Sequence, residues 1–70
     1  MVYKCLRFKA FTNPNIMGFV SLWLVKGKYE VTVVRKAGKK ERICRRFGSY
    51  QKAKEYFELR VLEFQILSEL

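Results

Sequence analysis

Residues 29–57, YEVTVVRKAGKKERICRRFGSYQKAKEYF, decide the fold of this 70-residue chain. As far as residue 46, apolar and polar side chains alternate around a turn rich in Lys, a pattern typical of a basic β-hairpin. A helical pattern follows with almost no linker and begins near Ser49, a favourable N-cap residue. The stretch therefore predicts a helix that supports a small sheet, and a sheet whose cations stay available to a polyanion.

Positive charge is concentrated before the predicted helix. The chain carries a formal charge of +9, and residues 1–48 account for +10 of it while residues 49–70 carry −1. So strong a basic balance in a short chain favours an anionic partner. Half of the residues are hydrophobic and 16% are aromatic, which is too apolar for a disordered basic tail. We therefore expect one folded domain that spans residues 1–70.

Four strands are expected, at residues 2–11, 18–26, 29–36 and 41–47, with turns at residues 12–15, 27–28 and 37–40. In the first strand, alternation places Val2, Leu6, Phe8 and Ala10 on one side. The second strand is apolar on both faces, with Val20, Leu22 and Leu24 on one and Phe19, Trp23 and Val25 on the other. Such a strand is central in a sheet, or its second face is covered by a partner.

A helix is expected over residues 50–69. Its apolar stripe, which would pack on the sheet, consists of Tyr50, Ala53, Phe57, Val61, Phe64 and Leu67. A second stripe consists of Leu59, Leu62, Ile66 and Leu70, and one sheet face cannot cover both stripes. We therefore expect either a sheet that curls around the helix or a homodimer through the second stripe.

Enzymatic chemistry is not expected, and neither is a metal or another cofactor. The chain has no histidine and no aspartate, and it has no Gly-rich phosphate loop. Its two cysteines, Cys5 and Cys44, lack the spacing of a zinc site. Buried reduced thiols and a disulfide between the first and last strands are both compatible with the sequence.

Nine cations within residues 26–46 form the candidate nucleic-acid-binding set: Lys26, Lys28, Arg35, Lys36, Lys39, Lys40, Arg42, Arg45 and Arg46. On a hairpin they would reach successive phosphates, and a two-stranded ribbon also fits the major groove of DNA. Trp23 and Tyr29 flank the first hairpin turn and are candidates for stacking on bases, although packing in the core is the commoner fate of such residues.

The run from residue 26 to about residue 57 resembles the small AP2-like, arm-type DNA-binding domains of phage and transposon tyrosine integrases. The resemblance lies in G-K-Y-x-V-x-V, in R-I-C-R-R-F, and in the closing Phe47, Ser49 and Ala53. It implies three antiparallel strands against one helix, with the sheet in the DNA major groove. The implied contacts come from Lys28, Arg35, Arg42 and Arg46, with Lys39 and Lys40 on phosphates.

We therefore expect an α+β fold, a three- to four-stranded antiparallel sheet with one long C-terminal helix packed on one face. The expected function is nucleic-acid binding, with double-stranded DNA favoured over RNA. Two alternatives are a protein-interaction module of a phage or mobile element that docks on an acidic host protein, and a ribosome-associated RNA-binding protein. The longest uncharged stretch is too short and too interrupted for a membrane span, so a cytoplasmic location is expected, with nucleoid association if the protein binds DNA.

Overall fold

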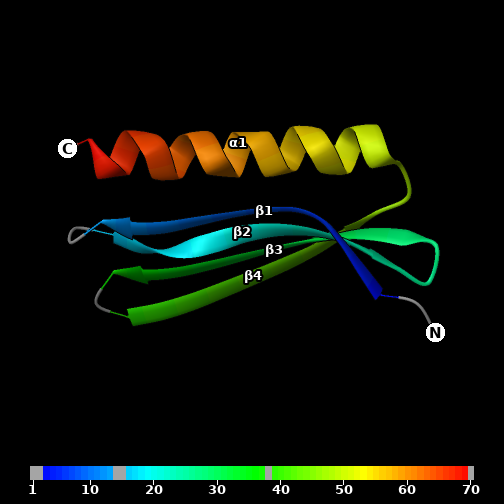
Figure 1. Cartoon of the computed structure of the whole chain (residues 1–70), viewed down its shortest axis with the longest axis horizontal. Helices are drawn as coiled ribbons and strands as arrows, with labels where there is room; N and C mark the ends of the chain where they lie inside the picture. The colour runs from blue at the N-terminus through cyan, green and yellow to red at the C-terminus, as the bar shows by residue number, and fades with distance from the viewer. Residues whose placement is uncertain (1–2, 14–15, 38, 70) are drawn as a thin grey trace.

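The chain folds as an α+β protein, as predicted, with a four-stranded antiparallel sheet and one C-terminal helix (Figure 1). The computed structural model describes residues 3–13, 16–37 and 39–69. Its elements are β1 (Tyr3–Asn13), β2 (Ile16–Val25), β3 (Lys28–Ala37), β4 (Lys39–Phe47) and α1 (Tyr50–Ser68). The sheet order is β1-β2-β3-β4, so each strand pairs with its neighbour in the sequence. Among the described residues, no helix has the length and apolarity needed to span a membrane.

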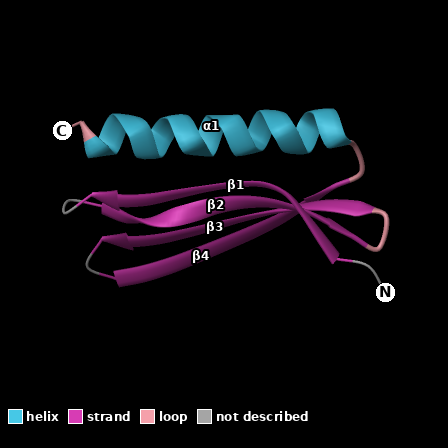
Figure 2. Ribbon diagram, viewed as in Figure 1, coloured by secondary structure: helices cyan, strands magenta, loops and turns pink. Residues whose placement is uncertain are grey.

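Helix α1 lies along one face of the sheet and packs mainly on the two central strands, β2 and β3 (Figure 2). Alternation explains this arrangement, because most helix-facing residues of those strands, such as Val20, Leu22 and Val31, are apolar. The buried core consists of Ile16, Val20, Leu22, Val31, Val33, Ala53, Phe57 and Phe64. The predicted apolar stripe of the helix is thus confirmed at its three most buried positions.

Strand β1 contains a β-bulge that alternation does not predict. Its pairing with β2 shifts by one residue between Cys5 and Arg7, which makes Leu6 the extra residue. The sequence pattern places Leu6 and Phe8 on the same side, and that prediction is wrong. Leu6 packs against the core, whereas Phe8 is 59% exposed on the other face of the sheet. Val2, which was expected beside them, lies outside the described residues.

The hairpin turn between β2 and β3 is displaced by one residue from its predicted position. Lys28 already pairs with Val25, so Lys26 and Gly27 are the two turn residues. Both have positive φ, 50° at Lys26 and 77° at Gly27, as a type I′ turn requires. The prediction at residues 27–28 misses this because lysine seldom takes the left-handed conformation.

The strands are longer than the sequence pattern predicts, and the other two turns are correspondingly shorter. β1 ends at Asn13 and β2 begins at Ile16, while β3 ends at Ala37 and β4 begins at Lys39. Most of the expected turn at residues 37–40 is therefore strand, and Ala37 pairs with Lys39. Residues 14–15 and 38 lie outside the described part of the chain.

Candidate nucleic-acid interface

The sheet surface that faces away from α1, hereafter the open face, combines aromatic and cationic side chains. Residues paired across antiparallel strands share a face, so the register assigns each side chain. One half, the aromatic column, consists of Tyr3 and Phe8 from β1 with Phe19 and Trp23 from β2. The other half, the cationic rows, consists of Lys28 and Lys36 from β3 with Lys40, Arg42 and Arg46 from β4.

A hollow of about 620 Å³ lies on the open face between the aromatic column and the cationic rows. All four aromatic residues line it, and so do Lys26, Arg42 and Arg46. Its floor includes Ser21 and Thr32, which pair across β2 and β3 and are only 2% and 7% exposed. The Oγ of Ser21 has no hydrogen-bond partner among the residues that the structure describes. The hollow therefore exists because two small residues occupy the floor between larger ones.

The structure divides the nine predicted cations between the two faces of the sheet. Five belong to the cationic rows, and Lys26 lines the same hollow from the neighbouring turn. Arg35 and Arg45 pair with helix-facing residues and lie on the opposite side. The side chain of Lys39 lies outside the described part of the chain. The sequence thus identifies the basic hairpin correctly but does not separate its faces.

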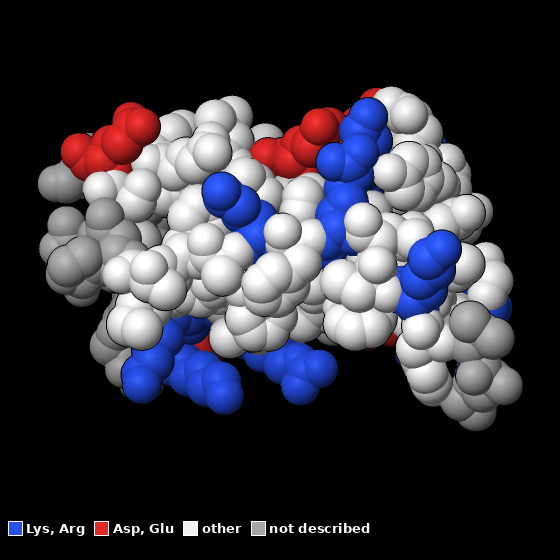
Figure 3. All heavy atoms as spheres, viewed as in Figure 1, with Lys and Arg blue, Asp and Glu red and all other residues white. Residues whose placement is uncertain are grey.

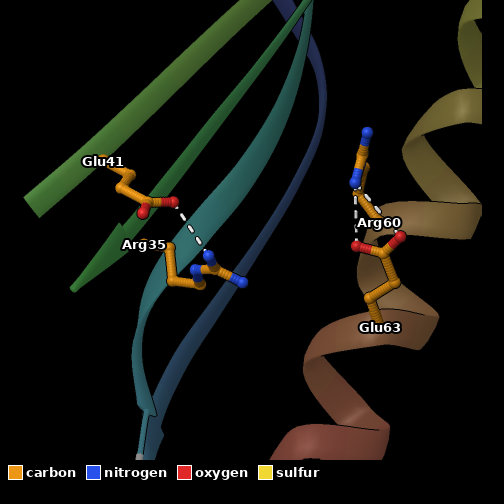
Figure 4. Close-up of polar contacts among 4 residues, drawn as sticks. All are labelled: Arg35, Glu41, Arg60 and Glu63. Atoms are coloured by element: carbon orange, nitrogen blue, oxygen red, sulfur yellow. Dashed lines mark hydrogen bonds and ion pairs between the residues drawn. The ribbon is translucent and has the colours of Figure 1, made fainter. Parts of the chain in front are cut away.

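Arg35 is engaged at the seam between the sheet and the helix. Its guanidinium donates to the Glu41 carboxylate at 2.8 Å, and on the helix Arg60 pairs with Glu63 at 2.9 Å (Figure 4). All four residues line a small hollow of about 90 Å³ between β3, β4 and α1. Arg35 is therefore paired within the protein and lies on the helix side of the sheet, away from the open face.

Arg45 also turns toward the helix. Its guanidinium lies 5.7 Å from the centroid of the Tyr56 ring, and that of Arg60 lies 4.8 Å from the same ring. Cations over an aromatic face are attracted by the quadrupole of the ring. Arg45 therefore contributes to packing of the helix on β4, and it lies on the side of the sheet opposite the open face.

On the open face, Glu30 is paired with Arg46, whose Nε donates to the carboxylate at 3.0 Å. A hydrogen bond from the Cys44 thiol, and after it the Arg46 guanidinium, hold the pKa of the Glu30 carboxyl below its usual value. Partial desolvation, together with Glu30, raises the pKa of the Cys44 thiol. Cys44 is therefore a neutral thiol at pH 7 and a poor nucleophile.

The two predicted stacking residues lie on opposite faces. Trp23 belongs to the aromatic column and lines the hollow. Tyr29 pairs with Phe47 on the helix side, packs against the core, and meets the Tyr50 ring edge-on at 5.6 Å. Trp23 shares its face with Val25, which pairs with Lys28, and Tyr29 follows Lys28 and therefore points to the opposite face. Tyr29 is thus a packing residue.

Three aromatic residues of the open face were not among the predicted site residues. Tyr3 and Phe8 are 56% and 59% exposed, and Phe8 stacks on Phe19 with ring centroids 5.5 Å apart. The sequence offers a signal for Phe19, because its strand is apolar on both faces and Phe19 lies on the face opposite Val20 and Leu22. For Phe8 no such signal exists, because the bulge at Leu6 reverses its direction.

Outside the sheet, the second helical stripe is exposed. Leu59, Leu62 and Ile66 are 52%, 50% and 53% exposed, so the sheet does not curl around the helix to cover them. Leu70, the fourth predicted member, lies outside the described residues.

The two cysteines are free and exposed, which corrects the expectation of buried thiols. Cys5 and Cys44 lie on the two edge strands, too far apart for a disulfide.

Charge is unevenly distributed over the molecular surface. In the view of Figure 3, most of the visible acidic side chains lie along the helix, while several Lys and Arg side chains protrude from the side of the sheet farthest from it. Among the described residues of the open face, Glu30 is the only acid.

Comparison of the chain with protein-family models, curated proteins and solved structures finds no match.

Proposed function

We propose that this protein binds nucleic acid through the open face. The observation that supports the proposal best is the excess of cations there, with five in the cationic rows and Lys26 beside them against the single described acid, Glu30. Lys and Arg contacts to phosphates dominate the affinity of most nucleic-acid-binding proteins. For this role we propose a cytoplasmic location, at the nucleoid if the ligand is DNA.

The affinity should fall steeply with salt, because bound cations displace counterions from the phosphates. Six neutralised phosphates give a slope of log K against log[salt] of about −5 on duplex DNA and about −4 on single strands. Duplex DNA, single-stranded DNA and folded RNA should each be titrated across a salt series. Absence of binding to all three at low salt would exclude the proposal.

A pair of double variants separates the open face from overall charge. Arg42→Gln/Arg46→Gln removes two cations from the open face, and Arg35→Gln/Arg45→Gln removes two from the helix side. The variants are matched, since each lowers the net charge by two and each breaks one ion pair with a glutamate. The first should weaken binding by about tenfold or more and flatten the salt slope by about 2. The second should bind almost as tightly as the original protein, and equal losses would contradict the assignment of the face.

A second candidate function is self-association through the helix, and the exposure of Leu59, Leu62 and Ile66 favours it. These residues recur at intervals of three and four, so they form one apolar strip on the outer side of α1. A second copy of the same strip would bury it. Because α1 covers the other face of the sheet, such a homodimer would leave both open faces accessible to nucleic acid.

A further inference from the structure

We infer that the strand bound on the open face is single, with its bases stacked on the aromatic column and its phosphates on the cationic rows. This inference rests on the proposed function and specifies its ligand. The relevant geometry is that the hollow has one aromatic wall, from β1 and β2, and one wall that carries Arg42 and Arg46. A polynucleotide has the same two-sided chemistry, with apolar base faces on one side of its backbone and charge along the other.

The aromatic wall is accessible and is not part of the core. Tyr3 and Phe8 are more than half exposed, and none of the four aromatic residues belongs to the buried core. Stacking on aromatic rings is available to every base, so it requires no particular sequence. Bases must be unpaired to use it, however, because in a duplex their faces are already covered by their neighbours. A duplex would meet the cations and leave the aromatic column unused.

The aromatic residues of β2 and the arginines of β4 are spaced regularly along their strands, as the bases and phosphates of a nucleic-acid strand are. Residues i and i+2 on one face of a strand are about 7 Å apart, so Phe19 and Trp23 stand about 13 Å apart, with the small Ser21 between them. Arg42 and Arg46 are equally far apart on β4, across the hollow. The two walls therefore present recognition groups at the same interval.

A second copy of this chain is a poorer occupant of the open face. Packing two such sheets face to face would bring the cationic rows of both copies into one interface, where they would lose water without gaining counter-charge. The single acid there, Glu30, is already paired with Arg46. A polyanion supplies the missing charge, and its bases cover the aromatic side. Charge complementarity thus favours a nucleic-acid strand.

The test uses Trp23, the only tryptophan of the chain, as an internal reporter. The probes are a single-stranded oligothymidylate of about 12 nucleotides and a duplex hairpin with the same number of phosphates. We expect the single strand to quench Trp23 fluorescence and to bind at least tenfold more tightly than the hairpin, since base stacking adds to the phosphate contacts.

A matched pair of variants assigns the stacking. Phe8→Leu removes an exposed ring from the aromatic column, and Tyr50→Leu removes a partly exposed ring from the helix. Phe8→Leu should weaken single-strand binding on the order of tenfold and leave hairpin binding unchanged, while Tyr50→Leu should change neither. Far-ultraviolet circular dichroism verifies that both variants are folded.

The outcomes separate this inference from the proposed function. If hairpin and single strand bind equally, with no quenching of Trp23 and no effect of Phe8→Leu, the inference is wrong although nucleic-acid binding stands. If neither probe binds at low salt, the proposed function fails with it. If Phe8→Leu dissociates a dimer of the free protein and neither probe quenches Trp23, the face belongs to a second copy and the inference is overturned.

Discussion

Gly18 shows how one residue limits the path of a central strand. It has φ of 156°, and a Cβ at this position would overlap the backbone carbonyl oxygen of Val34 on β3. Only glycine lets β2 and β3 approach so closely. Gly18→Ala should therefore destabilise the protein by roughly 3 kcal/mol, which lowers the melting temperature by about 15 °C in a domain of this size.

Gly48→Ala is the matched control, because a Cβ there meets nothing within 4 Å and the residue does not have positive φ. Its melting temperature should stay within about 3 °C of that of the original protein. Thermal unfolding followed by circular dichroism measures both variants. A Gly18→Ala protein as stable as Gly48→Ala would show that β2 can move away from β3 at little cost.

Individual residues also mark the limit of prediction from the sequence. The positions of Val20 and Leu22 follow from simple alternation, and the structure confirms that both are buried. The bulge at Leu6 has no signature in the sequence, since neither glycine nor proline lies near it. One inserted residue reverses every side chain beyond it, and Phe8 moves from the expected core to the open face for that reason.

In the β3–β4 hairpin, Glu30 stabilises the fold but should weaken nucleic-acid binding, because it pairs with Arg46 on the open face. Hydrogen bonds from Cys44 and Arg46 lower the pKa of Glu30. A carboxyl whose pKa is lowered by folding contributes stability above its unfolded pKa, near 4.5, and loses that contribution as pH falls through its folded pKa. Glu30→Gln should thus cost about 1 kcal/mol at pH 7. The difference from the original protein should shrink as pH falls below the unfolded pKa of 4.5, and it should vanish once pH is below the lowered folded pKa. Urea unfolding at a series of pH values measures it.

The same substitution should tighten nucleic-acid binding, because it removes the only described acid of the open face and releases Arg46 from its ion pair. We expect an increase of about threefold in affinity at low salt. Glu41→Gln is the control, since it removes an equal charge from the same hairpin but on the helix side. If Glu41→Gln tightened binding as much as Glu30→Gln, total charge would matter and the position of Glu30 would not.

The sequence predicts the strands and the helix, but it predicts only in part which of their side chains lie on the same face. Strong alternation in β3 and a clear stripe in α1 predict an α+β fold because each element must bury one apolar side. The nine cations, by contrast, alternate between faces along the hairpin. Arg35 and Arg45 fall on the helix side, where Glu41 and Tyr56 from neighbouring elements contact them. Such partners are known only once the strands are paired.

Across the whole molecule, the helix separates two surfaces that should act independently. The open face lies on one side of the sheet, and the strip of Leu59, Leu62 and Ile66 lies on the outer side of α1, which covers the other. A variant of the strip should therefore change the oligomeric state and leave the affinity per binding face unaltered. Conversely, the open-face variants should bind less nucleic acid without changing the oligomeric state.

Leu62→Glu tests the strip directly. Leu62 is 50% exposed, so the substitution should leave the monomer folded, but in a dimer it would bury two carboxylates against each other, which is strongly unfavourable. Sedimentation at about 100 µM, which detects even weak interfaces, should show a dimer for the original protein and a monomer for the variant. Gln51→Glu adds the same charge near the start of the helix, outside the strip, and should remain dimeric. A monomer of the original protein at this concentration would rule out the strip as a self-association surface, with no consequence for the open face.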